Sequence, residues 1–165
     1  WYDGGITSLR EGNSIIESIM PSKKLTNVSR NVLPISKYGN SFLPHSAVQQ
    51  IANDLEKIME TEKLYLENDI KLEILAQKLN VSKHHISQTI NRVYVVNFFD
   101  YINKKRIEEA KRILHNYEKK DLNVLEVAFM VGYNHKGTFN SVFKKMTGTT
   151  PTEYRKQIQS SPSLN

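Results

Sequence analysis

The sequence contains no cysteine, which excludes disulfide bonds and thiolate-ligated zinc sites. No apolar run approaches the roughly 18 residues that a membrane-spanning helix needs, and no signal peptide is visible. It also lacks a glycine-rich phosphate loop, a nucleophile–base–acid arrangement and a cluster of metal ligands. These absences argue against an enzyme, a cofactor, a metal centre and a small-molecule site. They are compatible with a reducing compartment such as the cytoplasm.

The positive charge lies mainly in the second half of the chain, which has 165 residues and a formal net charge of +6. Residues 1–81 hold nine Lys and Arg against ten Asp and Glu, whereas residues 82–165 hold fourteen against seven. A basic half suits a polyanionic partner such as nucleic acid. A solvated, lysine-rich helical surface explains the charge equally well, so charge alone leaves both interpretations open.

The first 45 residues differ in composition from the rest, because Gly and Pro recur there among many Ser and Asn. We expect a linker or leader over residues 1–45, with a short helix near 13–20. Because the chain opens on Trp1 rather than Met, we expect a longer parent protein. Residues 46–158 form the predicted domain, and residues 159–165 a frayed tail.

From residue 46 onward the spacing of apolar residues is helical. The sequence predicts an all-α fold of seven helices, beginning with a stripe of Val48, Ile51, Ala52, Leu55, Ile58 and Met59. The later helices are expected near residues 72–80, 82–94, 97–115, from 123, 135–147 and 150–156. Their start and stop signals are caps at Ser82, Asn97 with Asp100, Asn123 with Glu126, Thr150 with Glu153, and Gly148. Lys71 is a poor cap for the second helix, and Asn68 or Asp69 is the alternative.

Two helix-turn-helix patterns, at residues 72–90 and 124–143, can be superimposed on each other. Ala76 matches Ala128 at an offset of 52, and Ile86 matches Phe139 at an offset of 53. The helix over 97–115 would join the two units and would be about 28 Å long. One turn of DNA is about 34 Å, so the joining helix could separate two recognition helices by one turn. A repeated unit that presents a helix suits a repeating surface, and duplex DNA is such a surface.

The two recognition helices would each have an apolar and a polar face. Inward-facing residues are Ile86, Ile90 and Val93 on the first, and Phe139, Val142, Phe143 and Met146 on the second. The outer faces carry His84, Ser87, Gln88 and Asn91, then Lys136, Gly137, Asn140 and Lys144. Amides, lysines and small residues of this kind suit the major groove. Phosphate contacts are expected from Lys83, Asn91, Arg92, Lys144, Lys145 and the helix start at Thr150.

Each of these residues also has a simpler interpretation. Plain solvation is the usual role of a single polar residue on an exposed helix, although Gln88 and Asn140 recur on the same face of both units. Metal binding by His84 and His85 is disfavoured, because adjacent helix positions point about 100° apart and no carboxylate or thiolate completes a site. For Arg106, a buried ion pair and a phosphate contact both remain open, with a structural role favoured.

At these positions the chain resembles the AraC/XylS family of bacterial transcription regulators, over about residues 47–158. The second unit carries Ala128, Val131-Gly132-Tyr133, Phe139, Phe143-Lys144-Lys145, Gly148, Thr150-Pro151 and Tyr154-Arg155. The first unit adds Leu75-Ala76, Leu79, Val81-Ser82, His85-Ile86 and residues 98–110. An ordered double set of this kind is a much more specific signal than one helix-turn-helix.

The resemblance implies a sequence-specific regulator of transcription, an activator that acts through RNA polymerase. It implies base contacts from Lys83, His84, Ser87 and Gln88, and from Lys136, Gly137, Asn140 and Ser141. Family members commonly carry an N-terminal sensing domain, and we expect such a region to supply any dimerisation. Some relatives with a lead-in like residues 37–44 follow a membrane-embedded sensor, which suggests a tethered parent protein.

The chain departs from the family pattern at Val95, where Gly is usual. Val does not readily adopt φ > 0, so we expect a different loop there. Gly137 and Ser141 are small where larger side chains are common, so the second helix is expected to read fewer bases. The alternative function is a helical protein-interaction module whose basic face binds an acidic partner, and it would bind DNA only weakly and without sequence preference.

Overall fold

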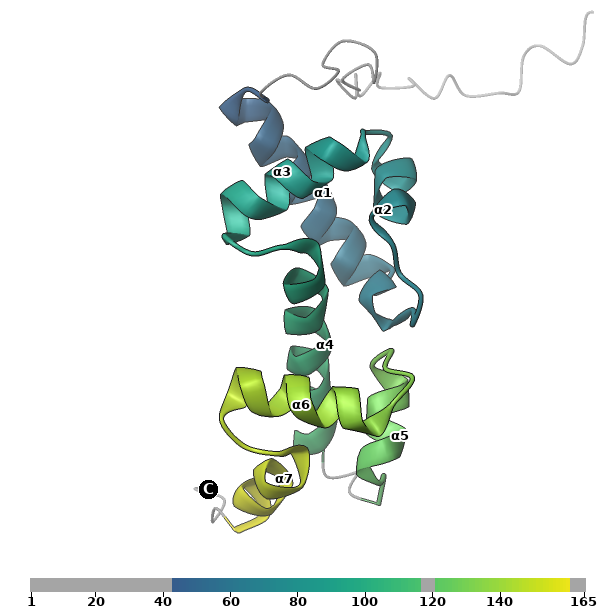
Figure 1. Cartoon of the computed structure of the whole chain (residues 1–165), viewed down its shortest axis with the longest axis vertical. Helices are drawn as coiled ribbons and strands as arrows, with labels where there is room; N and C mark the ends of the chain where they lie inside the picture. The colour runs from purple at the N-terminus through teal and green to yellow at the C-terminus, as the bar shows by residue number, and fades with distance from the viewer. Residues whose placement is uncertain (1–42, 117–120, 161–165) are drawn as a thin grey trace, which may run out of the picture. The chain divides into compact units, whose positions relative to one another are not determined.

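The computed structural model describes residues 43–116 and 121–160. Regular structure in these ranges consists of seven α-helices and one 3-10 turn, which confirms the all-α prediction (Figure 1). In chain order they are α1 (His45–Thr61), η2 (Leu64–Leu66), α2 (Leu72–Leu79), α3 (Lys83–Tyr94), α4 (Phe98–His115), α5 (Val124–Met130), α6 (Lys136–Thr147) and α7 (Pro151–Ser160). The expected helix near residues 13–20, the lead-in up to residue 42 and the last five residues of the tail lie outside the described residues.

The described helices form two hydrophobic cores that share α4. The first core joins α1, α2 and α3 to the start of α4 and includes the fully buried Leu55, Leu75, Ile86 and Ile90. The second joins later turns of α4 to α5 and α6 and includes Ala128, Val131, Phe139 and Phe143. Burial of each large apolar side chain contributes roughly 1.5–3 kcal/mol. Because Ile86 and Ile90 occupy the same places as Phe139 and Phe143, the packing follows the repeat in the sequence.

The helix caps follow the sequence signals at most positions. The Ser82 hydroxyl accepts the backbone N–H of His85 at 3.2 Å, and the Asn97 side chain accepts that of Asp100 at 2.9 Å. Asn123 and Glu126 form a reciprocal capping box. Gly148 ends α6 in the left-handed conformation, with φ of 83°. Each of these caps satisfies a backbone group that the helix end leaves open, which stabilises the ends locally.

Two of the predicted helix ends are wrong. Neither Asn68 nor Asp69 caps α2, whose N-cap residue is Lys71 without a side-chain hydrogen bond. The Asn68 amide instead donates to Asn134 Oδ1 at 3.0 Å. α7 continues beyond Lys156 to Ser160, whose hydroxyl donates to the carbonyl of Lys156 at 2.9 Å and extends the hydrogen bonding of the last turn.

The expectation of a different loop at Val95 is also wrong. Val95 ends α3 in the left-handed conformation, with φ of 57° and ψ of 32°, where the family usually has glycine. Its side chain is 84% exposed, so packing does not compensate for this conformation. A β-branched residue held there costs on the order of 1–3 kcal/mol. The cap at Asn97 and the core contacts of α3 and α4 therefore hold the loop in a shape that its own residue disfavours.

A buried arginine connects the two units in a structural role, as the sequence favoured, but it bonds to backbone carbonyls rather than to a carboxylate. The Arg106 side chain on α4 donates from Nε to the Tyr65 carbonyl and from Nη2 to the Glu67 carbonyl, both at 2.7 Å. Its guanidinium also lies over the Tyr133 ring, 5.1 Å from the centroid. Burial lowers the pKa of Arg106 from its ordinary value. The side chain thus ties the loop after α1 to the turn after α5, and it forms no ion pair with any described residue.

The same junction includes Gly132, whose φ is 85°. A Cβ at this position would lie 2.6 Å from the Leu66 carbonyl oxygen, which is well inside contact distance. The turn of the second unit therefore approaches the backbone before α2 as closely as only glycine allows.

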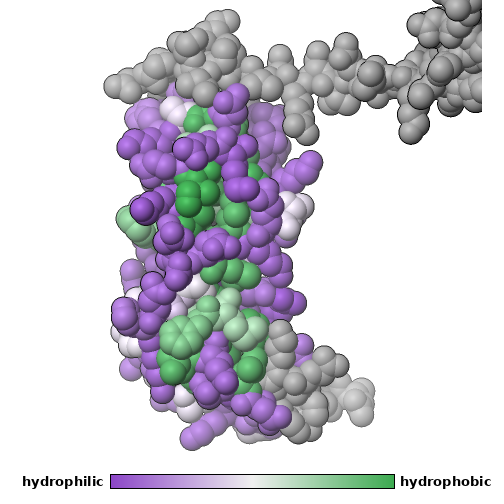
Figure 2. All heavy atoms as spheres, turned by 90° about the vertical axis from the view of Figure 1, so that its right-hand side faces the viewer, coloured by the Kyte–Doolittle hydropathy of each residue, from purple (hydrophilic) through white to green (hydrophobic). Residues whose placement is uncertain are grey.

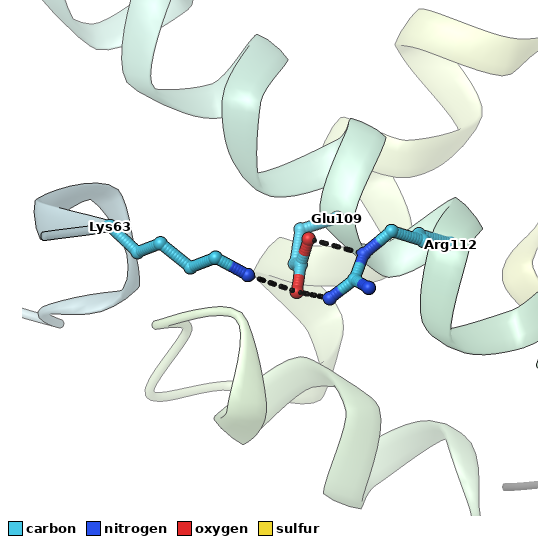
Figure 3. A network of polar contacts seen from close by, with 3 residues as sticks. All are labelled: Lys63, Glu109 and Arg112. Atoms are coloured by element: carbon cyan, nitrogen blue, oxygen red, sulfur yellow. Dashed lines mark hydrogen bonds and ion pairs between the residues drawn. The ribbon is translucent and has the colours of Figure 1, made fainter. Parts of the chain in front are cut away.

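An ion network adds a more exposed contact between the loop after α1 and α4 (Figure 3). Glu109 accepts from Arg112 Nε at 2.8 Å, while Lys63 Nζ lies 3.5 Å from the same carboxylate. The hydrogen bond from Arg112, followed by the charge of Lys63, holds the pKa of the Glu109 carboxyl below its usual value. Because the Lys63 and Arg112 side chains are 42% and 66% exposed, water screens the network and it contributes little compared with Arg106.

Candidate nucleic-acid interface

α3 and α6 are the second helices of the two helix-turn-helix units, and each packs on its core through one face only. Figure 1 shows α6 crossing α4 partway along its length, whereas α3 crosses α1 beyond the start of α4. On α3 the buried residues are His85, Ile86, Thr89 and Ile90, and on α6 they are Phe139 and Phe143. Val93 and Met146, expected to face inward, are more than a third exposed. They occupy equivalent places in the last turns of the two helices, and neither belongs to a core.

The base-contact candidates on α3 lie together at its N-terminal half. Lys83 and His84 are exposed, whereas Ser87 and Gln88 are half-buried. Lys83 Nζ forms an ion pair with Glu73 of α2 at 3.2 Å. Both side chains are more than half exposed, so water competes for this pair and a nucleic acid could replace it.

The candidates on α6 present a more open surface. Lys136, Gly137 and Ser141 are exposed, and Asn140 is half-buried. A Cβ added to Gly137 would meet nothing within 4 Å, so a partner can approach the backbone there. Within residues 43–116 and 121–160, no carboxylate lies within 4.0 Å of the Lys136 or Lys144 ammonium groups. Lys136 and Lys144 of α6 can therefore bind a phosphate or a base without first breaking an ion pair.

Gln88 and Asn140 share an unexpected environment at matching places in the two units. The amide oxygen of each is buried and has no hydrogen-bond partner among the described residues. A buried acceptor in this state costs about 1–3 kcal/mol. A bidentate contact with adenine uses the amide oxygen as well as the nitrogen, so each side chain must turn outward before it can make one.

The candidate phosphate-binding side chains differ in the contacts that they already make within the protein. Asn91 and Arg92 are exposed on α3, but Arg92 Nη1 donates to the Leu43 carbonyl at 2.9 Å and anchors the start of α1. Lys144 and Lys145 are exposed on α6, with Lys145 Nζ 4.0 Å from Asp100 Oδ1. These four side chains sit on or beside the outer faces of the two helices.

Thr150 caps α7 through a reciprocal arrangement with Glu153. The N–H of Thr150 donates to Glu153 Oε2 at 2.8 Å, and the Thr150 hydroxyl accepts the N–H of Glu153 at 3.3 Å. Hydrogen bonds from Thr150 lower the pKa of the Glu153 carboxyl, so this carboxylate remains charged at the helix start. The N–H of Thr150 is therefore already bonded, and an incoming phosphate would meet a negative charge beside it.

The sequence reasoning missed an exposed apolar face on α5. Leu125, Phe129 and Met130 are each more than a third exposed, whereas Val127 and Ala128 are fully buried. Figure 2 views the face of the molecule where α2 and α5 lie, and it shows hydrophobic residues exposed on that face. α5 has only seven residues and one inward stripe, so the other apolar residues had to face outward. Periodicity over residues 124–130 could have found this face.

Two negative findings limit the chemistry of the described part. Nowhere in its two ranges do three or more His, Cys, Asp or Glu side chains gather as a possible metal site. None of its helices combines the length and apolar character needed to cross a membrane.

Comparison with known proteins identifies the fold and its class. A helix-turn-helix domain model matches residues 75–157. The probable transcription factor PqrA of Proteus vulgaris is 32% identical over 107 residues, which is 65% of this chain and 84% of that protein. The uncharacterized HTH-type transcriptional regulator YijO of Escherichia coli (strain K12) is 35% identical over 88 residues, 53% of this chain but only 30% of YijO.

Solved structures agree with this result. The C-terminal domain of the two-component response regulator yesN from Fusobacterium nucleatum is 30% identical and covers 67% of this chain and 98% of that chain, with a TM-score of 0.53. The DNA-binding domain of AdpA, solved in complex with a target DNA, has a TM-score of 0.58 at 19% identity, over 70% of this chain and 97% of that chain. At that identity the likeness concerns the fold alone.

The double motif, the shared helix and these matches define a helix-turn-helix DNA-binding domain of a transcription regulator. The chain belongs to the AraC/XylS family, as its residue pattern predicted.

Proposed function

We propose that this domain binds double-stranded DNA in a sequence-specific manner, with α3 and α6 in two successive major-groove segments, and acts as an activator of transcription. The observation that carries the proposal is the equivalence of the two units. Ile86 and Phe139 anchor α3 and α6 at matching points, and polar faces are left outward on both helices. The major groove is wide enough for an α-helix that packs on the protein core through one face and presents polar side chains to the base edges on the other.

The proposed base contacts follow from the chemistry of the exposed groups. Lys83, His84, Ser87 and Gln88 would act from α3, and Lys136, Gly137, Asn140 and Ser141 from α6. Lysine donates to the guanine acceptors, an amide pairs with adenine, and hydroxyls bond to several base edges. The open backbone at Gly137 lets α6 approach the groove floor closely.

Gln88 and Asn140 gain more from binding than their contacts alone suggest. Their amide oxygens lack partners among the described residues, and a base edge would supply one. Turning outward thus exchanges an unsatisfied acceptor for a hydrogen bond, which favours the bound state.

Nonspecific affinity would come from Asn91, Arg92, Lys144 and Lys145. A phosphate contact at the helix start of Thr150 would require Glu153 to leave the Thr150 N–H first. Each phosphate neutralised by a cation releases counterions and steepens the salt dependence of binding by about 0.9 in log K against log salt. Lys144 is the strongest candidate, because no carboxylate of the described residues pairs with it.

In vitro selection of bound duplexes tests the proposal. We expect one preferred sequence made of two half-motifs about 10 base pairs apart. Titrations of the selected and of a random duplex, at two salt concentrations, then measure specificity. Equal affinity for both duplexes would contradict the proposal and favour the alternative, a protein-interaction module with a basic face.

Activation requires a second contact, which family resemblance assigns to RNA polymerase. The exposed apolar face of α5 (Leu125, Phe129 and Met130) is a surface for protein contact that the DNA-facing helices do not use. Phe129→Ser should then lower transcription in a purified system while DNA affinity stays the same. Unchanged transcription would remove α5 from the contact. Dimerisation and membrane tethering stay predictions.

A further inference from the structure

The segment that joins α3 to α4 carries the two most exposed large hydrophobic side chains of the described residues. Val95 is 84% exposed and Phe99 is 75% exposed. They lie four residues apart, on either side of the Asn97 cap. Single exposed apolar residues are common on protein surfaces, but two such residues on one short segment form a surface that water solvates poorly.

The conformation of Val95 makes this segment more unusual. A valine occupies a left-handed position that glycine would occupy without strain. Its side chain makes no compensating core contact, since it belongs to neither hydrophobic core. Strain that persists at an exposed position points to a use for the side chain outside the folded domain.

The segment lies between the two recognition helices. Val95 directly follows α3, and Phe99 is the second residue of α4. From the other side, Lys145 of α6 reaches to 4.0 Å from Asp100, the neighbour of Phe99. Figure 1 shows the α3–α4 connection between the levels of α3 and α6. If both recognition helices hold one duplex, the part of the duplex between the two major-groove segments lies opposite the α3–α4 connection.

Local charge distinguishes a sugar contact from a phosphate contact here. Asp100 is the acidic group next to Phe99, and the Lys145 ammonium lies beside it, so the segment has almost no net charge. The Asn97 amide also donates to Asp100 at 2.8 Å. A carboxylate at this place opposes a close phosphate, whereas an exposed phenyl ring and a valine methyl pair suit the C–H surface of deoxyribose.

We propose that Phe99, supported by Val95, packs against the sugar walls of the minor groove between the two major-groove segments. This inference rests on the proposed function, because it requires both recognition helices to engage one duplex. Apolar side chains placed against the minor groove favour a duplex that opens or bends at that point. The domain therefore selects deformable base steps, such as TA or CA/TG, at central positions that it does not read by hydrogen bonds.

The test compares Phe99→Ala with Phe129→Ala, a matched control that removes an exposed phenylalanine from α5. Both proteins are titrated with the selected duplex and with versions whose central steps are changed to stiff A-tracts, at two salt concentrations. Phe99→Ala should weaken binding to the selected duplex about tenfold, equivalent to about 1.4 kcal/mol. It should also reduce the preference for flexible central steps and leave the salt slope unchanged, because no phosphate contact is lost. The control should match the parent protein in its affinity for each duplex and in its salt slope.

Several results would overturn the inference. Unchanged affinity and unchanged central preference would remove Phe99 from the interface, and a shallower salt slope would indicate a phosphate contact instead. Unchanged DNA binding with reduced transcription would assign the segment to a protein partner. Failure of the proposed function looks different, since Gln88→Ala and Asn140→Ala would then also leave DNA binding unaltered. Thermal unfolding of each variant confirms that the exposed substitutions leave the fold intact.

Discussion

The two helix-turn-helix units share one scaffold but differ in how much structure surrounds the recognition helix. In the first, the 17-residue α1 packs on α3, and the Lys83 ammonium of α3 is paired with Glu73. In the second, α5 has seven residues, close to the eight of its counterpart α2, but it has an exposed apolar face. On α6, Lys136 and Lys144 form no ion pair among the described residues, whereas Lys145 Nζ lies 4.0 Å from Asp100 Oδ1. The difference suggests that α3 is held more rigidly, whereas α6 relies more on charge and close backbone approach.

The largest effect expected is on folding. Phe139→Ala should destabilise the domain by about 3–5 kcal/mol, because it removes a fully buried ring from the second core. Since α4 supplies residues to both cores, the first unit should unfold in the same transition. Denaturant unfolding followed by amide signals from both units checks this. Two separate transitions would show that the units are independent.

Arg106→Met should cost about 2–4 kcal/mol, because the carbonyls of Tyr65 and Glu67 lose their donors inside the junction. Arg106→Lys should rescue only part of this, since one ammonium cannot reproduce the guanidinium fork. Unfolding measurements give the stability. Binding to a duplex with both half-motifs should weaken more than binding to one half-motif, and equal weakening would mean that Arg106 does not set the spacing.

Gln88→Ala and Asn140→Ala test whether the two helices read bases equally. Each should relax specificity at its own half-motif and cost about 1–3 kcal/mol on the selected duplex. Repeated selection with each variant locates the affected bases. The same loss on random DNA would contradict a base-reading role for that residue.

Charge variants sharpen the comparison between α3 and α6. Lys144→Ala should weaken all duplexes alike and reduce the salt slope by about 0.9. Glu73→Gln should strengthen binding a few fold, because it releases Lys83 from its ion pair. Lys57→Ala on the exposed side of α1 serves as the control for both. If Glu73→Gln has no effect, Lys83 does not contact DNA.

The smallest effect concerns the α3–α4 connection. Val95→Gly should stabilise the free domain by about 0.5–1 kcal/mol, because glycine accepts the left-handed conformation at lower cost. Thermal unfolding measures this change. Gly148→Val provides the converse at the equivalent end of α6, where φ is 83° and stability should fall. A loss of stability in Val95→Gly would show that the valine side chain stabilises the fold after all.

Features set by neighbouring residues could be predicted from the sequence. Ser82 and Asn123 were identified as caps because their hydrogen-bond partners lie three residues away. Periodicity also placed Ile86 and Phe139 in the cores, because helical spacing depends only on residues nearby in the chain. The position of α3 and α6 as the outward helices therefore needed no tertiary information.

Contacts between distant segments could not be predicted in this way. Arg106 bonds to carbonyls 41 and 39 residues earlier in the chain, in a loop whose path the sequence does not reveal. Val95 shows the opposite failure, because the surrounding fold overrides its local preference. In the candidate interface, the half-buried state of the Gln88 and Asn140 amides depends on side-chain packing that a helical face does not specify.

The close approach of Gly132 to the Leu66 carbonyl limits how this domain can be divided. A protein engineer who excised α4 to α7 as a minimal single-motif binder would remove the backbone against which that turn is built. The Arg106 guanidinium would remain on α4 but would lose both of its acceptors, the carbonyls of Tyr65 and Glu67. The second helix-turn-helix motif therefore does not fold independently of the first. Shortened versions of the domain should retain the chain from α1 onward.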